Sequence, residues 1–339
     1  MMNWIWYTFP MHNSPEFIAI GDVVTDAFIR LRDGEVKECI DHHRQELCLS
    51  FGDKVPFEFV RVVKGVGNSA NAAVSAARLG MNAALIANVG KDREGEECIE
   101  ALEESKVSSK YITAHKGLTT NYHYVLWYDV ERTILVKHEH YPYSLPKIKT
   151  PPKWIYLSSL GENSLEYHQE ILAYLIEHPE IKLAFQPGTY QMKFGVEALK
   201  GIYARTDVFF CNVEESQRIL KTEESDIKKL LVAIAKLGPK YVFITDGIKG
   251  AYAYDGTTMW FMPVYPQDPY ERTGAGDAFA STVAVALAQG KSVEEALLWG
   301  PINSASVVQY VGAQEGLLTN AEMQKRIKKA PSDYKPTTI

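Results

Sequence analysis

The feature that most constrains the fold is an alternation of short apolar runs with helical periods, which extends from Phe17 to about Lys329. Alternation of this kind is typical of α/β proteins, in which helices cover a mostly parallel sheet. It begins with the run FIAIGD at 17–22 and ends with two long helical stretches, expected at 274–289 and 293–309. We therefore expect a layered α/β fold, and a chain of 339 residues allows one or two domains.

Two segments interrupt the alternation with strand-like pieces rather than crossover helices. They lie at about 27–64 and 118–140, and their β-branched and aromatic residues suit hairpins. We expect them to form a small β-sheet that lies over the main sheet as a lid. On this basis the chain divides into an N-terminal extension at 1–16, a main domain at 17–329 and a loose C-terminal tail at 330–339.

The charge and residue counts argue against several classes of function. A formal net charge of -6 disfavours the broad cationic surface that nucleic acid or anionic lipid would require. No stretch reaches the roughly 18 apolar residues of a membrane span. The four cysteines form no CxxC pair, the nine histidines show no zinc spacing, and the start resembles no secretory leader. We expect a reduced, cytoplasmic protein without a structural metal, a nucleic-acid partner or a membrane partner.

The most informative stretch is RTGAGDAFASTVAVALAQG, at 272–290. Gly274, Ala275 and Gly276 are small residues at a point where a loop enters a helix, so successive backbone N–H groups can face an anion. Asp277 lies on the first helical turn, where its carboxylate can take the proton of a hydroxyl that attacks a phosphoryl group. A helix cap and a tight turn would explain the same residues, and for an isolated motif we favour that interpretation.

TGAGDAF is the motif by which members of the ribokinase-like (PfkB) carbohydrate kinase family are identified, and the chain resembles this family from Phe17 to Lys329. The resemblance implies a three-layer, Rossmann-like ribokinase fold with a mostly parallel sheet and a β-sheet lid. It also implies an ATP-dependent kinase in which Gly274–Gly276 form an anion hole and Asp277 is the general base. The family commonly has DTTGAGD where this chain has ERTGAGD. The change at Arg272 argues against the activation by K⁺ that some members show.

The stretch KGVGNSANAAVSAARLG resembles the family's second signature, in which Gly67 and Asn71 match the positions that bind the acceptor. Glycine allows close approach to the backbone, and an amide both donates to and accepts from hydroxyls. Asp22 and Asp26 are similar to the acidic positions that the family places against sugar hydroxyls, although aspartates after a strand also serve as turn residues. GVGNSA also fits the dinucleotide fingerprint, which leaves an NAD-dependent enzyme as an alternative. The next strand, however, ends in NVG without the acid that binds a ribose.

The nucleotide side is expected from two further motifs. CNVEESQRIL has the NxxE arrangement of the family's magnesium-linked motif, and one carboxylate can bind Mg²⁺ through water. Glu215 would equally suit the role of an exposed first-turn acid favoured by the helix dipole. ITDGIKGAYAYDG looks like the segment beneath the ATP phosphates, and Asn303 lies where the family borders the adenine. The resemblance therefore implies a nucleotide and magnesium site formed by Asn212, Glu215, Thr245, Gly247, Gly250 and Asn303.

The acceptor is expected to be a free pentose or hexose with a primary hydroxyl. A nucleoside is the alternative within the same chemistry, because the aromatic strand at 122–128 could stack a base. A phosphorylated sugar would need a cation, for which Lys64 or Arg132 could serve. A non-catalytic sensor on a kinase fold stays open, since a fold does not fix function. Aromatic residues on both faces of the lid strands would be explained by a homodimer whose lids pack together.

Overall fold

The computed structural model describes residues 14–39 and 44–339, so most of the expected N-terminal extension lies outside the described residues. Its largest element is a ten-stranded sheet with the strand order β16-β15-β14-β13-β12-β11-β10-β1-β6-β7. Seven neighbouring strands run parallel: β1 (Phe17–Ile20), β6 (Ala83–Gly90), β7 (Ser108–His115), β10 (Trp154–Leu157), β11 (Lys182–Phe185), β12 (Val208–Asn212) and β13 (Tyr241–Thr245). Three antiparallel strands extend one edge: β14 (Ala251–Tyr254), β15 (Met259–Met262) and β16 (Thr337–Thr338).

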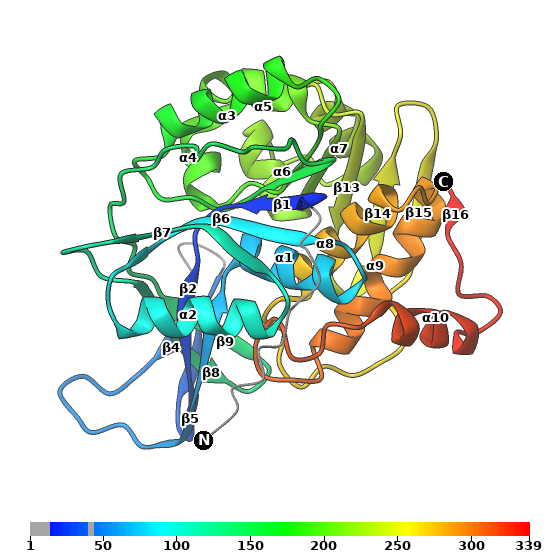
Figure 1. Cartoon of the computed structure of the whole chain (residues 1–339). Helices are drawn as coiled ribbons and strands as arrows, with labels where there is room; N and C mark the ends of the chain where they lie inside the picture. The colour runs from blue at the N-terminus through cyan, green and yellow to red at the C-terminus, as the bar shows by residue number, and fades with distance from the viewer. Residues whose placement is uncertain (1–13, 40–43) are drawn as a thin grey trace, which may run out of the picture.

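Helices cover both faces of this sheet, which gives three layers (Figure 1). Alternate residues of one strand belong to different cores: Phe17 and Ala19 pack on one face, whereas Ile18 and Ile20 pack on the other. This is the period of two that a strand buried on both sides requires. The first face carries α1 (Asn68–Arg78), α2 (Arg93–Glu104), α8 (Ala275–Ala288), α9 (Val293–Val307) and α10 (Asn320–Lys329). The second carries α3 (Leu165–Glu177), α4 (Thr189–Ala198), α5 (Lys200–Arg205), α6 (Val213–Leu220) and α7 (Ile227–Ala235).

A separate four-stranded sheet arises from the two segments that interrupt the alternation, as predicted. Its order is β5-β2-β8-β9, and we refer to it as the lid sheet. Figure 1 shows these strands extending away from the main sheet, beside α2. The strands are β2 (Val24–Leu31), β5 (Phe57–Val66), β8 (Asn121–Tyr128) and β9 (Glu131–Leu135), and a further ribbon consists of β3 (Glu35–Cys39) and β4 (Arg44–Cys48).

The prediction of a loose C-terminal tail is wrong. The side chain of Tyr334 is buried and packs edge-on against Tyr265, with 5.3 Å between the ring centroids. Beyond it, Thr337 and Thr338 pair with β15, and the Ile339 N–H donates to the carbonyl of Met259 at 3.1 Å. An edge strand offers unpaired backbone groups, and here the tail satisfies them. Prolines in the tail therefore indicate a turn and not a lack of structure.

Within residues 14–39 and 44–339, the structure has no helix whose length and apolar character would suit a membrane span.

Candidate active site

The N-terminus of α8 is formed by residues whose small size the structure explains individually. Gly274 has φ 82°, in the left-handed region, and a Cβ at this position would lie 2.4 Å from the Cβ of Ala313. Both facts require glycine. A Cβ on Gly276 would meet nothing within 4 Å, so the space in front of it is open. In the described part of the chain, the N–H groups of Gly276 and Asp277 have no hydrogen-bond acceptor. They are available to an anion.

Asp277 accepts hydrogen bonds from three side-chain amides. The Asn68 Nδ2 donates to Oδ1 at 3.0 Å, the Gln186 Nε2 to Oδ1 at 3.1 Å, and the Asn71 Nδ2 to Oδ2 at 2.8 Å. Burial raises the pKa of Asp277 above its ordinary value, and the amide donors and the positive charge of Arg132 oppose this rise. A carboxylate with a raised pKa is a better proton acceptor than an ordinary aspartate at the same position.

Two of these amides are themselves held in orientation. The Tyr156 hydroxyl donates to Oε1 of Gln186, and the Gln314 Nε2 donates to Oδ1 of Asn71 at 3.0 Å. Because each amide oxygen is engaged as an acceptor, the NH₂ group is the end that faces Asp277. From the sequence, Asn71 is expected at the acceptor, and neither Gln186 nor Gln314 is expected at the site. A polar residue directly after an apolar strand, as in the FQPG stretch after β11, is the signal that could have indicated Gln186.

The loop before α8 is organised by Glu271, which is fully buried. Its Oε1 accepts from the N–H and the hydroxyl of Thr273 at 2.7 and 2.6 Å, and its Oε2 accepts from the Gly312 N–H at 3.2 Å. The next residue, Arg272, forms an ion pair with Glu131 at the start of β9. The lid sheet therefore reaches the loop that carries the helix N-terminus.

The predicted acceptor residues Gly67 and Asp22 lie against each other. Gly67 has φ 114°, and a Cβ on it would lie 2.8 Å from the carbonyl oxygen of Asp22. The Asp22 side chain is buried, and its carboxylate accepts from the Tyr143 hydroxyl at 2.8 and 3.0 Å. Asp26 lies on β2 beside His123 of β8, with Oδ1 and Nδ1 3.3 Å apart. The structure thus brings the four predicted acceptor residues to one region but ties the Asp22 carboxylate to protein donors.

The NxxE motif forms the capping box of α6. The Glu215 N–H donates to Oδ1 of Asn212 at 2.8 Å, and the Asn212 N–H donates to Oε2 of Glu215 at 2.8 Å. Burial raises the pKa of Glu215, and the negative charge of Asp277 contributes to the rise. Glu215 is therefore a first-turn acid that caps α6, as the alternative interpretation has it, but it is partly buried rather than exposed.

The segment after β13 provides two glycines in the left-handed region, Gly247 with φ 52° and Gly250 with φ 113°. A Cβ on Gly250 would lie 2.5 Å from the carbonyl oxygen of Met262, so this glycine lets β14 pack beside β15. A Cβ on Gly247 would meet nothing within 4 Å, so the space beside it, near Thr245 at the end of β13, is open.

The position of Asn303 corrects one expectation. Its side chain is fully buried, its Nδ2 donates to the Thr282 hydroxyl at 2.7 Å, and its Oδ1 accepts from the Leu318 N–H at 2.9 Å. Both ends of the amide are used inside the core, where they join α8 to α9. The side chain of Asn303 therefore does not border an adenine. A polar residue in a buried helix serves to satisfy its neighbours as readily as to bind a ligand.

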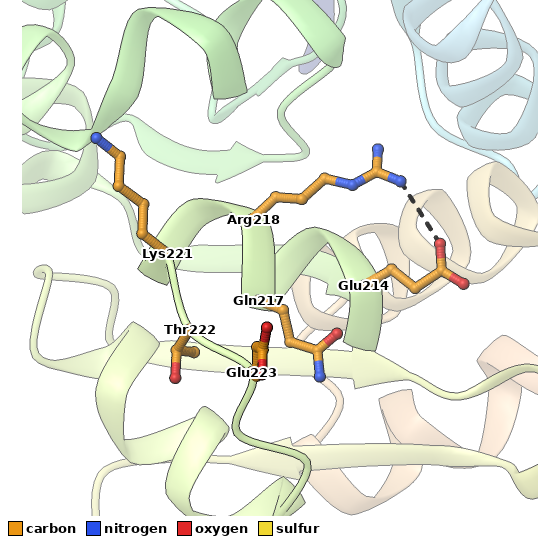
Figure 2. A pocket seen from close by; sticks show the side chains of 6 residues that line it. All are labelled: Glu214, Gln217, Arg218, Lys221, Thr222 and Glu223. Carbon is orange, nitrogen blue, oxygen red and sulfur yellow. Dashed lines mark ion pairs between the residues drawn. The ribbon is translucent and has the colours of Figure 1, made fainter. Parts of the chain in front are cut away.

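A surface hollow of about 530 Å³ lies beside α6 and is bounded by an ion pair between Arg218 and Glu214, 3.6 Å apart (Figure 2). Its lining residues are Glu214, Gln217, Arg218, Lys221, Thr222 and Glu223. None of them is among the residues that donate to Asp277, and most are exposed. We therefore place the site at the α8 N-terminus and not in this hollow.

A helix N-terminus with free N–H groups beside an oriented carboxylate, on a three-layer α/β fold, has the features of a small-molecule phosphotransferase. Comparison with known families supports this class. The model of the pfkB family of carbohydrate kinases matches residues 39–320, which is most of the chain, and the chain therefore belongs to this family. The predicted family and the predicted kinase class are both confirmed.

The curated relatives that resemble this chain are named for different phosphoryl acceptors. The chain is 26% identical over 268 residues to an ATP-dependent 6-phosphofructokinase of Thermoanaerobacterium thermosaccharolyticum, which covers 73% of this chain and 80% of the relative. It is 27% identical over 264 residues to a ribokinase of Bacillus subtilis, covering 76% and 86%. It is 26% identical over 262 residues to a cytidine kinase of Thermococcus kodakarensis, covering 74% and 90%. The chain is a sugar or nucleoside kinase of the PfkB family.

Solved structures share the fold. The Arabidopsis thaliana ribokinase complexed with ribose and ATP matches with a TM-score of 0.76 and 20% identity, over 93% of this chain and 99% of that one. A putative ribokinase II from E. coli, in complex with ATP and Mg²⁺, matches with a TM-score of 0.70 and 17% identity, over 93% and 99%. The predicted ribokinase fold is confirmed.

Proposed function

We propose that this kinase transfers the γ-phosphoryl group of ATP to a primary hydroxyl of a free sugar, with Asp277 as the general base. One observation carries the proposal: Asp277 is held by three amides directly beside backbone N–H groups that have no acceptor within the described residues. A base and an anion-binding group so close together suit the transfer of a phosphoryl group to a hydroxyl.

The hydrogen bonds of Asp277 suit this role. A carboxylate has about four acceptor positions, of which three receive amide N–H groups here. The remaining position can accept the proton of the sugar hydroxyl as its oxygen attacks phosphorus. At the proposed Gly274–Gly276 anion hole, the free N–H groups of Gly276 and Asp277 would then stabilise the negative charge on the transferred phosphoryl group. Water would be excluded by the lid sheet, whose Glu131 already contacts Arg272.

ATP and Mg²⁺ are the proposed donor and cofactor. Glu215 fits an indirect magnesium ligand because only its Oε2 is used in the capping box and because its pKa is raised, in part by the charge of Asp277. A cation near both carboxylates would relieve that repulsion. Mg²⁺ would neutralise charge on the phosphates, and the open space beside Gly247 would admit the phosphate groups. We do not propose a K⁺ site, since the guanidinium of Arg272 lies in the segment concerned.

A nucleoside is the second candidate acceptor, because one relative is a cytidine kinase. The aromatic residues of β8 divide into two groups. Trp127 is 1% exposed and packs edge-on against Tyr270 with centroids 5.2 Å apart, so it serves the core of the lid. Tyr122 and Tyr124 lie 5.2 Å apart, and Tyr124 is 49% exposed, so these two remain available for stacking on a base.

A homodimer through the lid sheets is proposed from the exposed apolar side chains that this sheet carries. They are Phe57, Phe59, Val60, Val62, Tyr124, Ile134 and Leu135, and Val136, directly after β9, is exposed as well. A second lid sheet is a partner of matching apolar character, and covering such a surface is favourable. Sedimentation of a monomer at micromolar concentration would contradict the dimer.

A cytoplasmic location is proposed because Cys98 and Cys211 are free thiols in the core.

The proposal is tested by ADP release from Mg-ATP with free sugars, sugar phosphates and nucleosides, each compared with a reaction that lacks the acceptor. We expect one class of unphosphorylated acceptor to stimulate ADP release strongly, with a phosphate ester as the second product. If no acceptor stimulates release while ATP still binds, a non-catalytic sensor becomes the better interpretation.

A further inference from the structure

Two aspartates and two histidines meet where the lid sheet joins the main domain. Asp26 of β2 and His123 of β8 are neighbours in register, with Oδ1 and Nδ1 3.3 Å apart. Asp22 and His138 form a second pair, with Oδ2 and Nδ1 3.4 Å apart. The two histidine rings lie 5.3 Å apart, so the pairs form one group, which we call the Asp–His cluster.

Three polar atoms of this cluster form no hydrogen bond with any described residue, although two of them lie within ion-pair distance of a neighbour. Oδ1 of Asp26, Nε2 of His123 and Nδ1 of His138 are buried and have no hydrogen bond within the described residues. Asp22 differs, because its carboxylate accepts from Tyr143, whose raised pKa keeps the hydroxyl protonated. Buried polar groups are nearly always satisfied in folded proteins. The unsatisfied atoms therefore indicate the place where a polar ligand binds.

The Asp–His cluster and Asp277 are contacted by the same two segments of the chain. On one side, the carbonyl of Asp22 accepts from the hydroxyl of Ser69 at 3.2 Å, and the neighbouring Asn68 donates to Asp277. On the other side, the ring of His138 packs edge-on against Tyr190, with 5.9 Å between the ring centroids, and Tyr190 lies in the first turn of α4, which follows the loop that carries Gln186. A ligand seated on the cluster is thus placed between the two segments that hold the base.

The chemistry of the cluster favours hydroxyl groups and disfavours a phosphate. A carboxylate accepts a hydrogen bond, and a neutral imidazole offers one donor and one acceptor, so adjacent hydroxyls can alternate along these atoms. Within the described residues, no ion pair joins the cluster to the cations considered for a phosphate: Lys64 pairs with Glu97 at 2.8 Å and Arg132 with Glu131 at 3.7 Å, although the charge of Arg132 reaches Asp277. A phosphate beside two aspartates would be repelled without compensation.

We infer, on the basis of the proposed kinase function, that His123 and His138 recognise the acceptor and that the site takes an unphosphorylated polyhydroxyl compound through adjacent hydroxyls. The two histidines are specificity-determining residues, and the carboxylates of Asp22 and Asp26 beside them exclude sugar phosphates. The sequence alone assigns neither histidine a role, because His123 meets Asp26 through the parallel pairing of β2 with β8, and His138, which follows β9, meets Asp22 only in the folded chain.

The test uses calorimetric binding in the absence of ATP, with D-ribose, D-fructose, cytidine and D-fructose 6-phosphate as probes. The variants are His123→Gln and His138→Gln. The matched control is His140→Gln, because the side chain of His140 is 64% exposed and pairs with Glu162 at the surface. ATP binding to each variant reports on the integrity of the fold. We expect each buried histidine change to weaken binding of the best unphosphorylated probe by about 10-fold, with ATP binding and the control unchanged.

Three results would overturn the inference. They are unchanged binding in both buried histidine variants, tighter binding of D-fructose 6-phosphate than of every unphosphorylated probe, and no binding of any unphosphorylated probe at millimolar concentration. The second and third use the wild-type protein and do not depend on how the variants fold. Binding without ADP formation would refute the kinase proposal alone. ADP formation with an unchanged acceptor KM in both variants would refute the role of the histidines alone.

Discussion

Gly274 and Gly276 stand two positions apart, yet the structure predicts opposite consequences for replacing each with alanine. Gly274 has φ 82°, and its new Cβ would lie 2.4 Å from Ala313. The left-handed conformation costs about 1–2 kcal/mol with a side chain, and overpacking against a neighbour costs about 1–3 kcal/mol. We therefore expect Gly274→Ala to lower the free energy of unfolding by about 2–5 kcal/mol, a large part of the stability of a typical domain.

Gly276 lies inside α8 without a positive φ, and an added Cβ would meet no atom within 4 Å. Alanine is the better helix former, so Gly276→Ala should leave the free energy of unfolding unchanged or raise it by up to about 1 kcal/mol. The new methyl group would occupy the space proposed for the phosphoryl group. We expect turnover to fall by at least about 10-fold, since a displacement of about 1 Å costs as much as 100-fold.

The assay is urea unfolding followed by circular dichroism, paired with steady-state ADP release for each variant. We expect Gly274→Ala to lower the urea concentration at the unfolding midpoint. We expect Gly276→Ala to lower turnover while the unfolding midpoint stays unchanged. Equal loss of stability in both variants would refute the reasoning about the backbone of Gly274. Full turnover in Gly276→Ala would refute the position assigned to the phosphoryl group.

The other predictions concern the base and the C-terminus. Gln186→Leu removes one hydrogen-bond donor to Asp277. We expect turnover to fall by about 10- to 100-fold with the KM for ATP unchanged. An unaltered turnover would show that Gln186 does not position Asp277. Burial raises the pKa of Asp277, and a general base must be deprotonated. We therefore expect kcat/KM to decline as the pH falls through a pKa above the ordinary aspartate value. A decline in kcat/KM only at or below the ordinary aspartate pKa would contradict this. Tyr334→Ala should lower the free energy of unfolding by about 3 kcal/mol, as loss of a buried ring does, whereas a loose tail would show no change in urea unfolding.

Local patterns were sufficient to predict the layers of the fold and the position of the α8 N-terminus. The packing of Phe17, Ile18, Ala19 and Ile20 on alternate faces of the sheet follows from one short apolar run, and the loop of small residues before Asp277 lies in one continuous stretch. These features depend on neighbours in sequence. They can be interpreted without knowledge of the tertiary contacts.

The surroundings of Asp277 could not be predicted in the same way. Asn68 and Asn71 lie on α1 and Gln186 follows β11, so their meeting at one carboxylate depends on the order of the strands. Gln314, which orients Asn71, lies after α9. The Asp–His cluster likewise depends on the pairing of β2 with β8. Asn303 shows the opposite error, since a position matched to a family motif proved to be a buried amide that joins two helices.

The central claim, that Asp277 takes the proton of the acceptor, is tested most directly by comparing Asp277→Asn with the wild-type enzyme on the best acceptor and Mg-ATP. Asparagine keeps the shape but removes the base. We expect kcat to fall by about 100- to 10,000-fold, with ATP affinity within about twofold of wild type. Near-normal turnover in this variant would contradict the claim and remove Asp277 from the chemistry.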